Sequence, residues 1–429
     1  MSFIPRTHFP FPTNTPSWFA GHMSRSLTKL PTVLKDIDLV IEARDARLPL
    51  TSINPAFDEV LEESWGKMNM AGPSGWKGKG KEKVVVYTKR DQAEERFEEP
   101  LKRAFKKHAN QSIFFADTRS DRDVRKVLAH AVDVSKRNFD PLHDMKVLVV
   151  GMPNVGKSSL LNALRRVGVR KGKAFQTSSL PGHTRKFTGT VKVHETPPVY
   201  VYDMAGIMVP YLGKGEEGME RGLKLGLTSG IKESLFPPEI LADYLLYRMN
   251  LHPRFTASTS PYPGLPLPSA FTDQTNALEE LLTALAKRLG TLMIGGIPDV
   301  DAAQRYLLKS FGEGKLGRWT LDDLISDPAA ARRTRSISEN EGVVEGEDSE
   351  SPAEPERELG LTAAVDRTVS TYLREEVERR NRRADGIPES LSQEKKKARK
   401  SAVEERKKKW EAKMANAGGI APGSRKTRR

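Results

Sequence analysis

Short apolar runs recur along the first half of the chain and predict the strands of a β-sheet. Each run is four to six residues long and rich in β-branched side chains. Continuous apolar strands of this kind are typical of a parallel or mixed sheet that is buried on both faces. The runs lie at residues 38–43, 83–88, 113–116, 146–150, 190–193 and 199–202.

Helical spacing of apolar residues lies between several of these runs, for example at 97–108 and 122–136. The alternation of strands and helices predicts an α/β fold with an open, doubly wound sheet, which we place at residues 17–212. Helical patterns at 276–289, 300–311 and 321–325 then predict a smaller all-α domain at residues 213–327.

Loops and extensions are marked by a change of composition. Residues 66–83 are rich in glycine and lysine and residues 256–272 in proline, so we expect a mobile loop at the first and a loop at the second. Residues 336–358 hold nine acidic side chains and one basic one. This predicts an acidic disordered linker at 328–359.

The remaining residues, 360–429, are expected to form a basic tail. Helical patterns cover 361–381 and 393–414, and the last residues have the composition of a disordered end. The last 36 residues carry 14 basic and four acidic side chains, which is most of the formal net charge of +14. Such a block favours a polyanionic partner, with nucleic acid first, although a solvated tail that only aids solubility has the same composition.

Composition narrows the class of protein. The 429 residues include 37% hydrophobic and 29% charged residues, and no apolar run approaches the ~20 residues that span a bilayer. There is no cysteine, which removes thiolate metal sites and cysteine nucleophiles. Residues 1–16 have no acidic side chain, as in a targeting segment, yet their prolines would break an amphipathic helix, so import into mitochondria stays open at this point.

The sharpest motif runs from Gly151 to Ser158 and matches G-x-x-x-x-G-K-[ST]. It follows an apolar strand and precedes a helical pattern, which is the context that a phosphate-binding loop requires. The backbone amides around Asn154, Val155 and Gly156 and the helix start at Ser159 would bind phosphates. Lys157 would reach the β- and γ-phosphates, and the Ser158 hydroxyl would bind Mg²⁺.

Two further segments fit the same chemistry. Asp203 ends a strand and can hold Mg²⁺, directly or through water, while Gly206 three residues later can approach the γ-phosphate. Between this D-x-x-G sequence and the phosphate loop lies Thr184, whose hydroxyl would bind Mg²⁺ and whose amide would meet the γ-phosphate.

A base-reading motif lies before the phosphate loop. Thr88, Lys89 and Asp91 match the [NT]-K-x-D sequence at a strand end. The Asp91 carboxylate would accept two hydrogen bonds from guanine, a pair of donors that adenine lacks. Asp117 and Thr118 follow the next strand, where a loop would cover the base. GTP and GDP are therefore the expected ligands, with the base-reading parts preceding the phosphate-reading parts.

In the order of these motifs along the chain, the protein resembles the circularly permuted GTPases of the YlqF/RbgA type. Among these it is most similar to the members that serve the mitochondrial large ribosomal subunit. The resemblance implies GTP hydrolysis in large-subunit assembly, contact with ribosomal RNA and a mitochondrial matrix location. It covers residues 17–327 and is carried by WFAGHM at 18–23, DLVIEARDARLP at 38–49, TKRD at 88–91, the phosphate loop, PGHT at 181–184, DMAG at 203–206 and FGEGKLGRWTL at 311–321.

The chain departs from the family pattern at three positions. Thr88 stands where the family usually has asparagine, which could lower guanine affinity while Asp91 keeps the specificity. Ala20 and Ala205 stand where proline is common. Neither position supplies a side-chain ligand, so we expect function to survive there.

Hydrolysis is expected to be slow without a partner. Ile207 occupies the position of the water-orienting glutamine of Ras-like enzymes and cannot orient water. The resemblance implies that Asn154 helps to hold K⁺ near the phosphates. His22 could orient water if its segment folds over the nucleotide, and the alternative is a structural or RNA-contacting role. Lys157, Thr184 and Gly206 complete the expected catalytic set.

Two other functions compete with a ribosome-assembly switch. One is an RNA-binding scaffold with a degenerate nucleotide site, against which the intact Lys157, Ser158 and Asp203 argue. The other is a membrane-associated regulatory GTPase whose basic tail binds anionic lipid. A peripheral contact with the mitochondrial inner membrane is compatible with the first function, and we expect a monomer.

Overall fold

The computed structural model describes residues 3–12, 21–66, 75–76, 80–138, 144–172, 188–209, 212–213, 215–231, 235–256, 260–325 and 354–384. The chain divides into two compact units, Met1–Leu373 and Arg374–Arg429. The regions expected at 17–212 and 213–327 both fall within the first unit. The predicted helix at 393–414 and the end of the basic tail lie outside the described residues.

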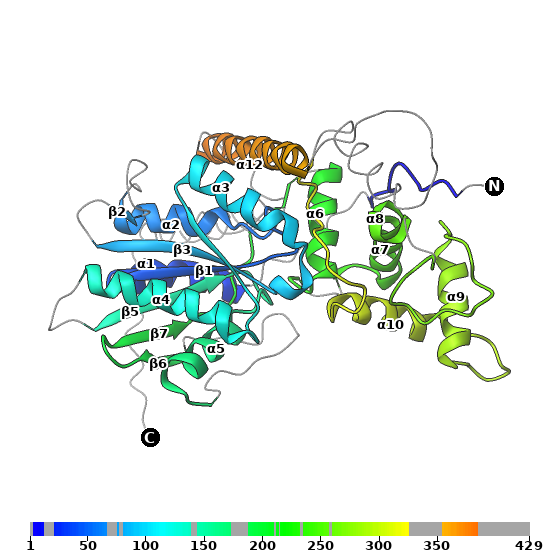
Figure 1. The fold of residues 1–429 in the computed structure, drawn as a ribbon, viewed down its shortest axis with the longest axis horizontal. Coiled ribbons are helices and arrows are strands. Elements are labelled where there is room, and N and C mark those ends of the chain that lie inside the picture. Colours follow the sequence, from blue (N-terminus) through cyan, green and yellow to red (C-terminus); the bar gives the residue numbers. More distant parts are fainter. Residues whose placement is uncertain are drawn as a thin grey trace, which may run out of the picture. The chain divides into compact units, whose positions relative to one another are not determined.

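A seven-stranded sheet organises the first unit (Figure 1). Each of the six predicted runs falls in a strand, except that Asp38 precedes the first strand. The mobile loop predicted at residues 66–83 is wrong at residues 75–76 and 81–83, which lie in strands. The strands are β1 (Leu39–Asp45), β2 (Gly75–Trp76), β3 (Lys81–Thr88), β4 (Ser112–Ala116), β5 (Met145–Gly151), β6 (Thr188–His194) and β7 (Val199–Asp203). Their order is β2-β3-β1-β5-β7-β6, and β4 also pairs with β3.

The register of the parallel strands brings three chain segments to one edge. β1 is parallel to both β3 and β5, with Asp45 opposite Thr88 and Ala43 opposite Gly151. The strand that ends in the base-reading motif and the strand that ends in the phosphate loop are thus separated by one strand only. The permuted order of the motifs therefore does not prevent them from meeting in space.

Helices cover both faces of the sheet, as predicted for a doubly wound fold. On one face, α4 (Asp121–Arg137) and α5 (Lys157–Val169) pack on side chains such as Val86 and Val149. On the other, α1 (Gly21–Leu34), α2 (Pro55–Trp65) and α3 (Glu98–Ala109) pack on alternate strand residues such as Val85 and Leu148. This alternation follows from the two-residue period of a strand.

The helical region contains α6 (Gly215–Leu227), α7 (Pro238–Leu251), α8 (Pro253–Thr256), α9 (Leu278–Leu289) and α10 (Val300–Gly312). The helices predicted at 276–289 and 300–311 are confirmed as α9 and α10. The prediction of a helix at 321–325 is wrong, because this segment has no regular secondary structure. The Leu321 amide donates instead to the Arg47 carbonyl over 2.9 Å, a tertiary contact that replaces a helical hydrogen bond.

The first residues of the chain pack on the helical region. Phe9 is buried and contacts the Tyr244 ring of α7 edge to face, at 5.2 Å between centroids. Arg6 forms an ion pair with Asp243 at 2.7 Å. The described part of the segment predicted for targeting therefore belongs to the packed structure of the first unit.

Helix α12 (Glu354–Ala384) begins within the range predicted for the acidic linker and crosses into the second unit. Its first-unit part contacts α3, where Asp366 pairs with Lys107 at 2.8 Å and with His108 at 2.9 Å. Val365 and Val369 are buried in the same hydrophobic cluster as Phe105 of α3. The rest of the predicted linker, at 328–353, lies outside the described residues.

Candidate GTP-binding site

The loop between β5 and α5 is shaped around two glycines with positive φ angles. At Gly151 (φ 148°), an added Cβ would lie 2.3 Å from the Ala43 carbonyl oxygen of β1. Gly156 (φ 90°) directly precedes α5, and its Cβ would lie 3.2 Å from Thr88 Oγ1. Side chains at these two positions would clash or strain the backbone, so the sequence pattern of the motif reflects the packing of the loop.

Lys157, the first residue of α5, is buried within the loop that precedes it. Its Nζ donates to the Met152 carbonyl oxygen at 2.7 Å. Burial lowers the pKa of Lys157 to about 8, and the nearby Asp203 carboxylate offsets only part of this effect. A buried ammonium group facing loop carbonyls gains stability when an anion binds beside it, which suits the phosphates of a nucleotide.

Ser158 and Asp203 lie side by side at the start of α5 and the end of β7. Ser158 Oγ is 3.1 Å from Asp203 Oδ2, and Asp203 Oδ1 is buried without a hydrogen-bond partner among the described residues. Burial raises the pKa of Asp203, against the opposing effects of Lys157 and Ser158. A hydroxyl and a buried carboxylate oxygen in need of a partner fit Mg²⁺, which binds few protein ligands and keeps oxygens of water and phosphate.

Gly206 lies against the phosphate loop, with its hypothetical Cβ at 2.7 Å from the Pro153 backbone and 2.9 Å from Lys157 Nζ. The next amide, of Ile207, donates to the Gly151 carbonyl at 3.2 Å. The Ile207 side chain is buried in the cluster formed with α1 and α2. The D-x-x-G backbone is therefore fixed to the phosphate loop, with the Ile207 side chain in the hydrophobic core.

Thr88 connects the base-reading motif to the phosphate loop. It is fully buried, and its Oγ1 lies 3.0 Å from the Arg44 carbonyl and in short contact with the Val155 carbonyl. One hydroxyl can donate one hydrogen at a time, so these carbonyls share it. The residue that departs from the family pattern thus still contacts both β1 and the phosphate loop.

Lys89 follows in a left-handed conformation (φ 55°), and its Nζ contacts Asp45 Oδ2 at 2.9 Å. Asp45 also accepts from Arg47, at 2.8 Å from Nη2. Burial alone would raise the pKa of Asp45, but Arg47 and Lys89 outweigh it and hold the pKa well below its usual range. Asp45 therefore stays ionised and positions the lysine of the motif.

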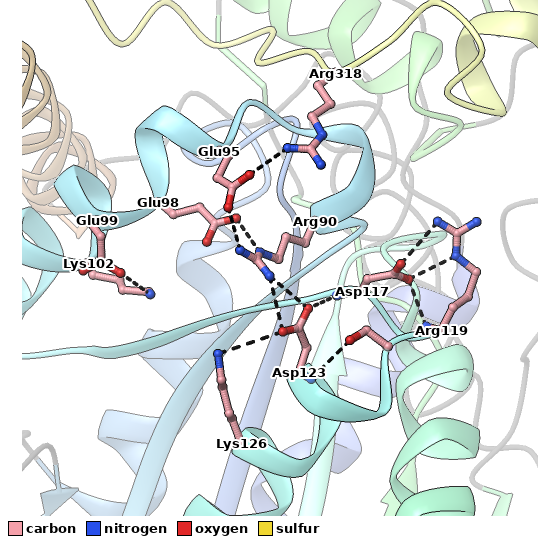
Figure 2. A network of polar contacts seen from close by, with 11 residues as sticks. Arg90, Glu95, Glu98, Glu99, Lys102, Asp117, Arg119, Asp123, Lys126 and Arg318 are labelled. Carbon is pink, nitrogen blue, oxygen red and sulfur yellow. Dashed lines mark hydrogen bonds and ion pairs between the residues drawn. The ribbon is translucent and has the colours of Figure 1, made fainter.

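Asp91, within the short 3-10 helix η1 (Arg90–Gln92), forms an ion pair with Arg119 (Oδ2 to Nη2, 2.6 Å). Figure 2 shows Arg119 also against Asp117, whose Oδ1 accepts from Arg119 Nε at 3.1 Å and from its backbone amide at 2.9 Å. The two loops predicted to surround the base are therefore brought together, with Arg119 between them.

Arg90, the neighbour of Asp91 in the chain, forms ion pairs with acidic residues beside these loops (Figure 2). Its guanidinium donates to Glu98 at 2.6 Å and lies 3.3 Å from Asp123. Asp123 in turn accepts from the Asp117 amide at 3.2 Å. This chain of charge-assisted contacts fixes the position of Asp117 relative to the motif that contains Asp91.

A strap of residues 318–322, which follows α10, is attached to the same loops. Its Trp319 amide donates to the Gln92 carbonyl at 2.8 Å. Its Asp322 carboxylate accepts from the Leu50 and Thr51 amides, both at 2.8 Å, and from the Thr51 hydroxyl at 2.6 Å. The sequence did not predict these contacts, because the partners are more than 200 residues apart and no local pattern links them.

The other predicted residues are placed as follows. Thr118 follows β4, and its carbonyl accepts from Arg166 at 3.0 Å. The side-chain Nδ2 of Asn154 lies 3.5 Å from the Thr228 carbonyl oxygen. Val155 is buried, and Ser159 lies in the first turn of α5. Thr184, Ala20 and the side chain of His22 lie outside the described residues, although Gly21 begins α1.

The described part of the chain contains neither a cluster of metal-binding side chains nor a membrane-spanning helix. Within the described ranges, no cluster of three or more His, Asp or Glu side chains is placed so that it could hold a metal ion. Among the described helices, none combines the length and the apolar character needed to cross a bilayer.

Comparisons with known proteins point to one family. A family model described as "50S ribosome-binding GTPase" matches residues 146–234. A protein from Xenopus tropicalis, mitochondrial ribosome-associated GTPase 1, is 31% identical over 75% of this chain and 99% of its own length. Ribosome biogenesis GTPase A from Bacillus cereus is 29% identical over 71% of this chain and 93% of its own.

Among solved structures, the chain is similar to GNP-bound YlqF from T. maritima. The match has a TM-score of 0.40 and 22% identity, and it covers 70% of this chain and 97% of that one.

Proposed function

The chain belongs to the family of mitochondrial ribosome-associated GTPase 1, and from this premise we propose that it serves as a GTP-dependent switch in assembly of the mitochondrial large ribosomal subunit. GTPase activity itself follows from family membership. The partner, the residue roles and the cellular location are our proposals.

The observation that carries the proposal is the meeting of two motifs at one edge of the sheet. Thr88 of the base-reading segment contacts Val155 of the phosphate loop, although 67 residues separate them in the chain. Asp91 would then accept the guanine donors while Gly156 and the following amides of α5 bind the phosphates. Asp117 and Thr118 complete the loop beside the base.

Lys157, Ser158 and Asp203 have separate roles at the phosphates. Lys157 neutralises charge on the β- and γ-phosphates, which stabilises the charge that develops during transfer. Ser158, Asp203 and Thr184 would hold Mg²⁺, which neutralises phosphate charge when bound. Gly206 brings its amide to the γ-phosphate because no side chain separates it from Pro153 and Lys157.

The activating element is expected to come from outside the motifs described. The Ile207 side chain lies in the hydrophobic core and cannot orient the attacking water. We assign to Asn154 a place in a K⁺ site and to His22 a role in orienting water on the ribosome. Because Ile207 cannot orient water, we expect slow hydrolysis by the isolated protein and faster hydrolysis with its partner.

The ribosomal particle would be bound through ribosomal RNA. The helical region and the basic residues beyond 393 would contact phosphates, and this contact should weaken as salt rises. We propose that the protein acts as a monomer in the mitochondrial matrix, with peripheral contact with the inner membrane as a secondary feature.

The decisive experiment measures GTP hydrolysis by the purified protein with and without mitochondrial large subunits, in K⁺ and in Na⁺. We expect strong stimulation by large subunits in K⁺ and little by small subunits. Equal rates in K⁺ and Na⁺ would remove the K⁺ role of Asn154. His22→Ala with unchanged stimulated hydrolysis would remove the role of His22.

Two results would redirect the proposal. RNA binding with no hydrolysis under any of these conditions would favour an RNA-binding scaffold. Stimulation by vesicles of anionic lipid, and by neither subunit, would favour a membrane-associated GTPase.

A further inference from the structure

The carboxylate that we assign to guanine recognition has a second partner. Asp91 Oδ2 accepts a hydrogen bond from Arg119 Nη2 at 2.6 Å, the short distance of a charge-assisted bond. A carboxylate that reads guanine must present its oxygens to the N1 and N2 donors of the base. Arg119 therefore occupies Oδ2, one of the two Asp91 oxygens that guanine requires.

Arg119 is also held by Asp117, through its backbone amide as well as its side chain. Asp117 accepts from the backbone amide of Arg119 at 2.9 Å and from Nε at 3.1 Å, and its Oδ2 lies 3.3 Å from Nη2. The Asp117 amide is itself held by Asp123, which Arg90 contacts. Figure 2 shows this series of contacts leading from Arg90 to Arg119.

Loss of the contact with Asp91 would leave Arg119 attached to Asp117. The Arg119 side chain is 73% exposed, so water can solvate the guanidinium once it leaves Asp91. Opening therefore breaks a single ion pair near the surface, and such pairs contribute little to stability. The contact can open and close without rearrangement of the strands that carry either loop.

We propose that Arg119 is a latch that competes with the guanine base for Asp91 and so lowers the affinity of the site for GTP and GDP. The proposal rests on the assignment of guanine recognition to Asp91. The latch closes on Asp91 as the base leaves, which favours release of GDP, and it must open before the base can bind.

The first test measures binding of a fluorescent GDP analogue, at equilibrium and by stopped flow. It compares the Arg119→Gln variant with the unmodified protein, both as full-length chains. We expect a Kd about two- to fivefold lower and faster association, as for the loss of an exposed ion pair. The gain should shrink as salt is raised, because screening weakens the pair in the unmodified protein. An unchanged or higher Kd would overturn the latch.

Arg125→Gln is the matched control. Arg125 is also an exposed arginine (69%), and it faces Asp121 at 4.0 Å within α4, away from Asp91. This variant removes the same charge and should leave the Kd for GDP unchanged. A decrease equal to that of Arg119→Gln would mean that net charge, and not the contact with Asp91, sets the affinity, which also overturns the latch.

A double-mutant comparison tests the latch separately from the assignment of guanine recognition to Asp91. Asp91→Asn should shift preference from guanosine to xanthosine diphosphate, because the amide complements the altered base edge. In that background the charge that attracts Arg119 is gone, so adding Arg119→Gln should leave the Kd for xanthosine diphosphate unchanged. Tightening that persists there contradicts the latch alone, while a failed shift in base preference contradicts the assignment of Asp91 and the latch with it.

Discussion

At Gly206, contact distances determine which residue the site accepts. A methyl group there would lie 2.7 Å from the Pro153 backbone, closer than real side chains come. The backbone angle at Gly206 is not in the left-handed region, so the requirement for glycine comes from the neighbours and not from the fold of the segment.

Gly206→Ala is therefore expected to reduce GTP hydrolysis by about tenfold or more, since relief of the clash must displace the phosphate loop or Lys157. Hydrolysis under saturating GTP, with thermal unfolding as a check of folding, measures this. Gly312→Ala at the end of α10 is the control, because nothing lies within 4 Å of its added methyl group. Equal rates for the two variants would contradict the assigned role of Gly206.

Thr88 gives a second prediction at this scale. Thr88→Val keeps the shape of the side chain but removes the hydrogen that the Arg44 and Val155 carbonyls share. Loss of one such bond costs about 1 kcal/mol, so we expect roughly fivefold weaker GDP binding. Thr88→Ser keeps the hydroxyl and should bind within about twofold of the unmodified protein. Unchanged binding by Thr88→Val would show that the hydroxyl does not support the phosphate loop.

At the scale of elements, the strap of residues 318–322 connects α10 to the base-reading side of the sheet. Asp322 is buried, and both of its oxygens accept hydrogen bonds from the loop that follows β1. That loop directly follows Asp45, the last residue of β1, which forms an ion pair with Lys89. The strap is thus positioned to support the lysine of the motif through the loop.

Asp322→Asn places an amide donor against backbone donors, so we expect a loss of about 1–3 kcal/mol in the free energy of unfolding. Urea denaturation measures the change. Asp273→Asn should change the free energy little, because Asp273 is exposed and accepts a hydrogen bond from the hydroxyl of its neighbour Thr272 at the surface. Similar values for the two variants would show that the strap does not contribute to stability.

The sequence predicted the strands and the phosphate loop because each depends on neighbouring residues. It missed α1, which contains Pro31, and α2, which starts at Pro55 after the capping residue Asn54. It also predicted a helix at 321–325, where tertiary hydrogen bonds prevail. The pairing of Arg119 with Asp91 could not be predicted, since it depends on how two separate strands place their following loops.

At the scale of the whole first unit, burial of His252 makes stability depend on pH. Burial, followed by the charges of Arg96, Arg248 and Arg254, lowers the pKa of His252 to about 4. In the unfolded chain the value is about 6.5. Between these values only the unfolded chain takes up the proton, so the contribution of neutral His252 is full above pH 6.5 and is lost as the pH falls toward 4.

We therefore expect the free energy of unfolding to decrease from pH 7 to pH 5. The His252→Phe variant should show a smaller decrease. It keeps an aromatic ring against Trp319, whose ring centroid lies 4.5 Å from that of His252. Urea midpoints at several pH values measure both effects. An identical pH profile for His252→Phe would mean that other groups, such as the partly buried His130, cause the decrease.

The permuted chain order has a mechanical consequence. Gly206 is followed within nine residues by Gly215, the first residue of α6. In this short connection Ile207, Met208, Val209 and Leu212 are buried, and Gly213 is partly exposed. A displacement at the γ-phosphate would thus reach the helical region through a short connection in which residues 207–209 and 212 are packed in the core. We therefore expect the helical region to move when the bound nucleotide changes, because it is attached to the chain close to Gly206.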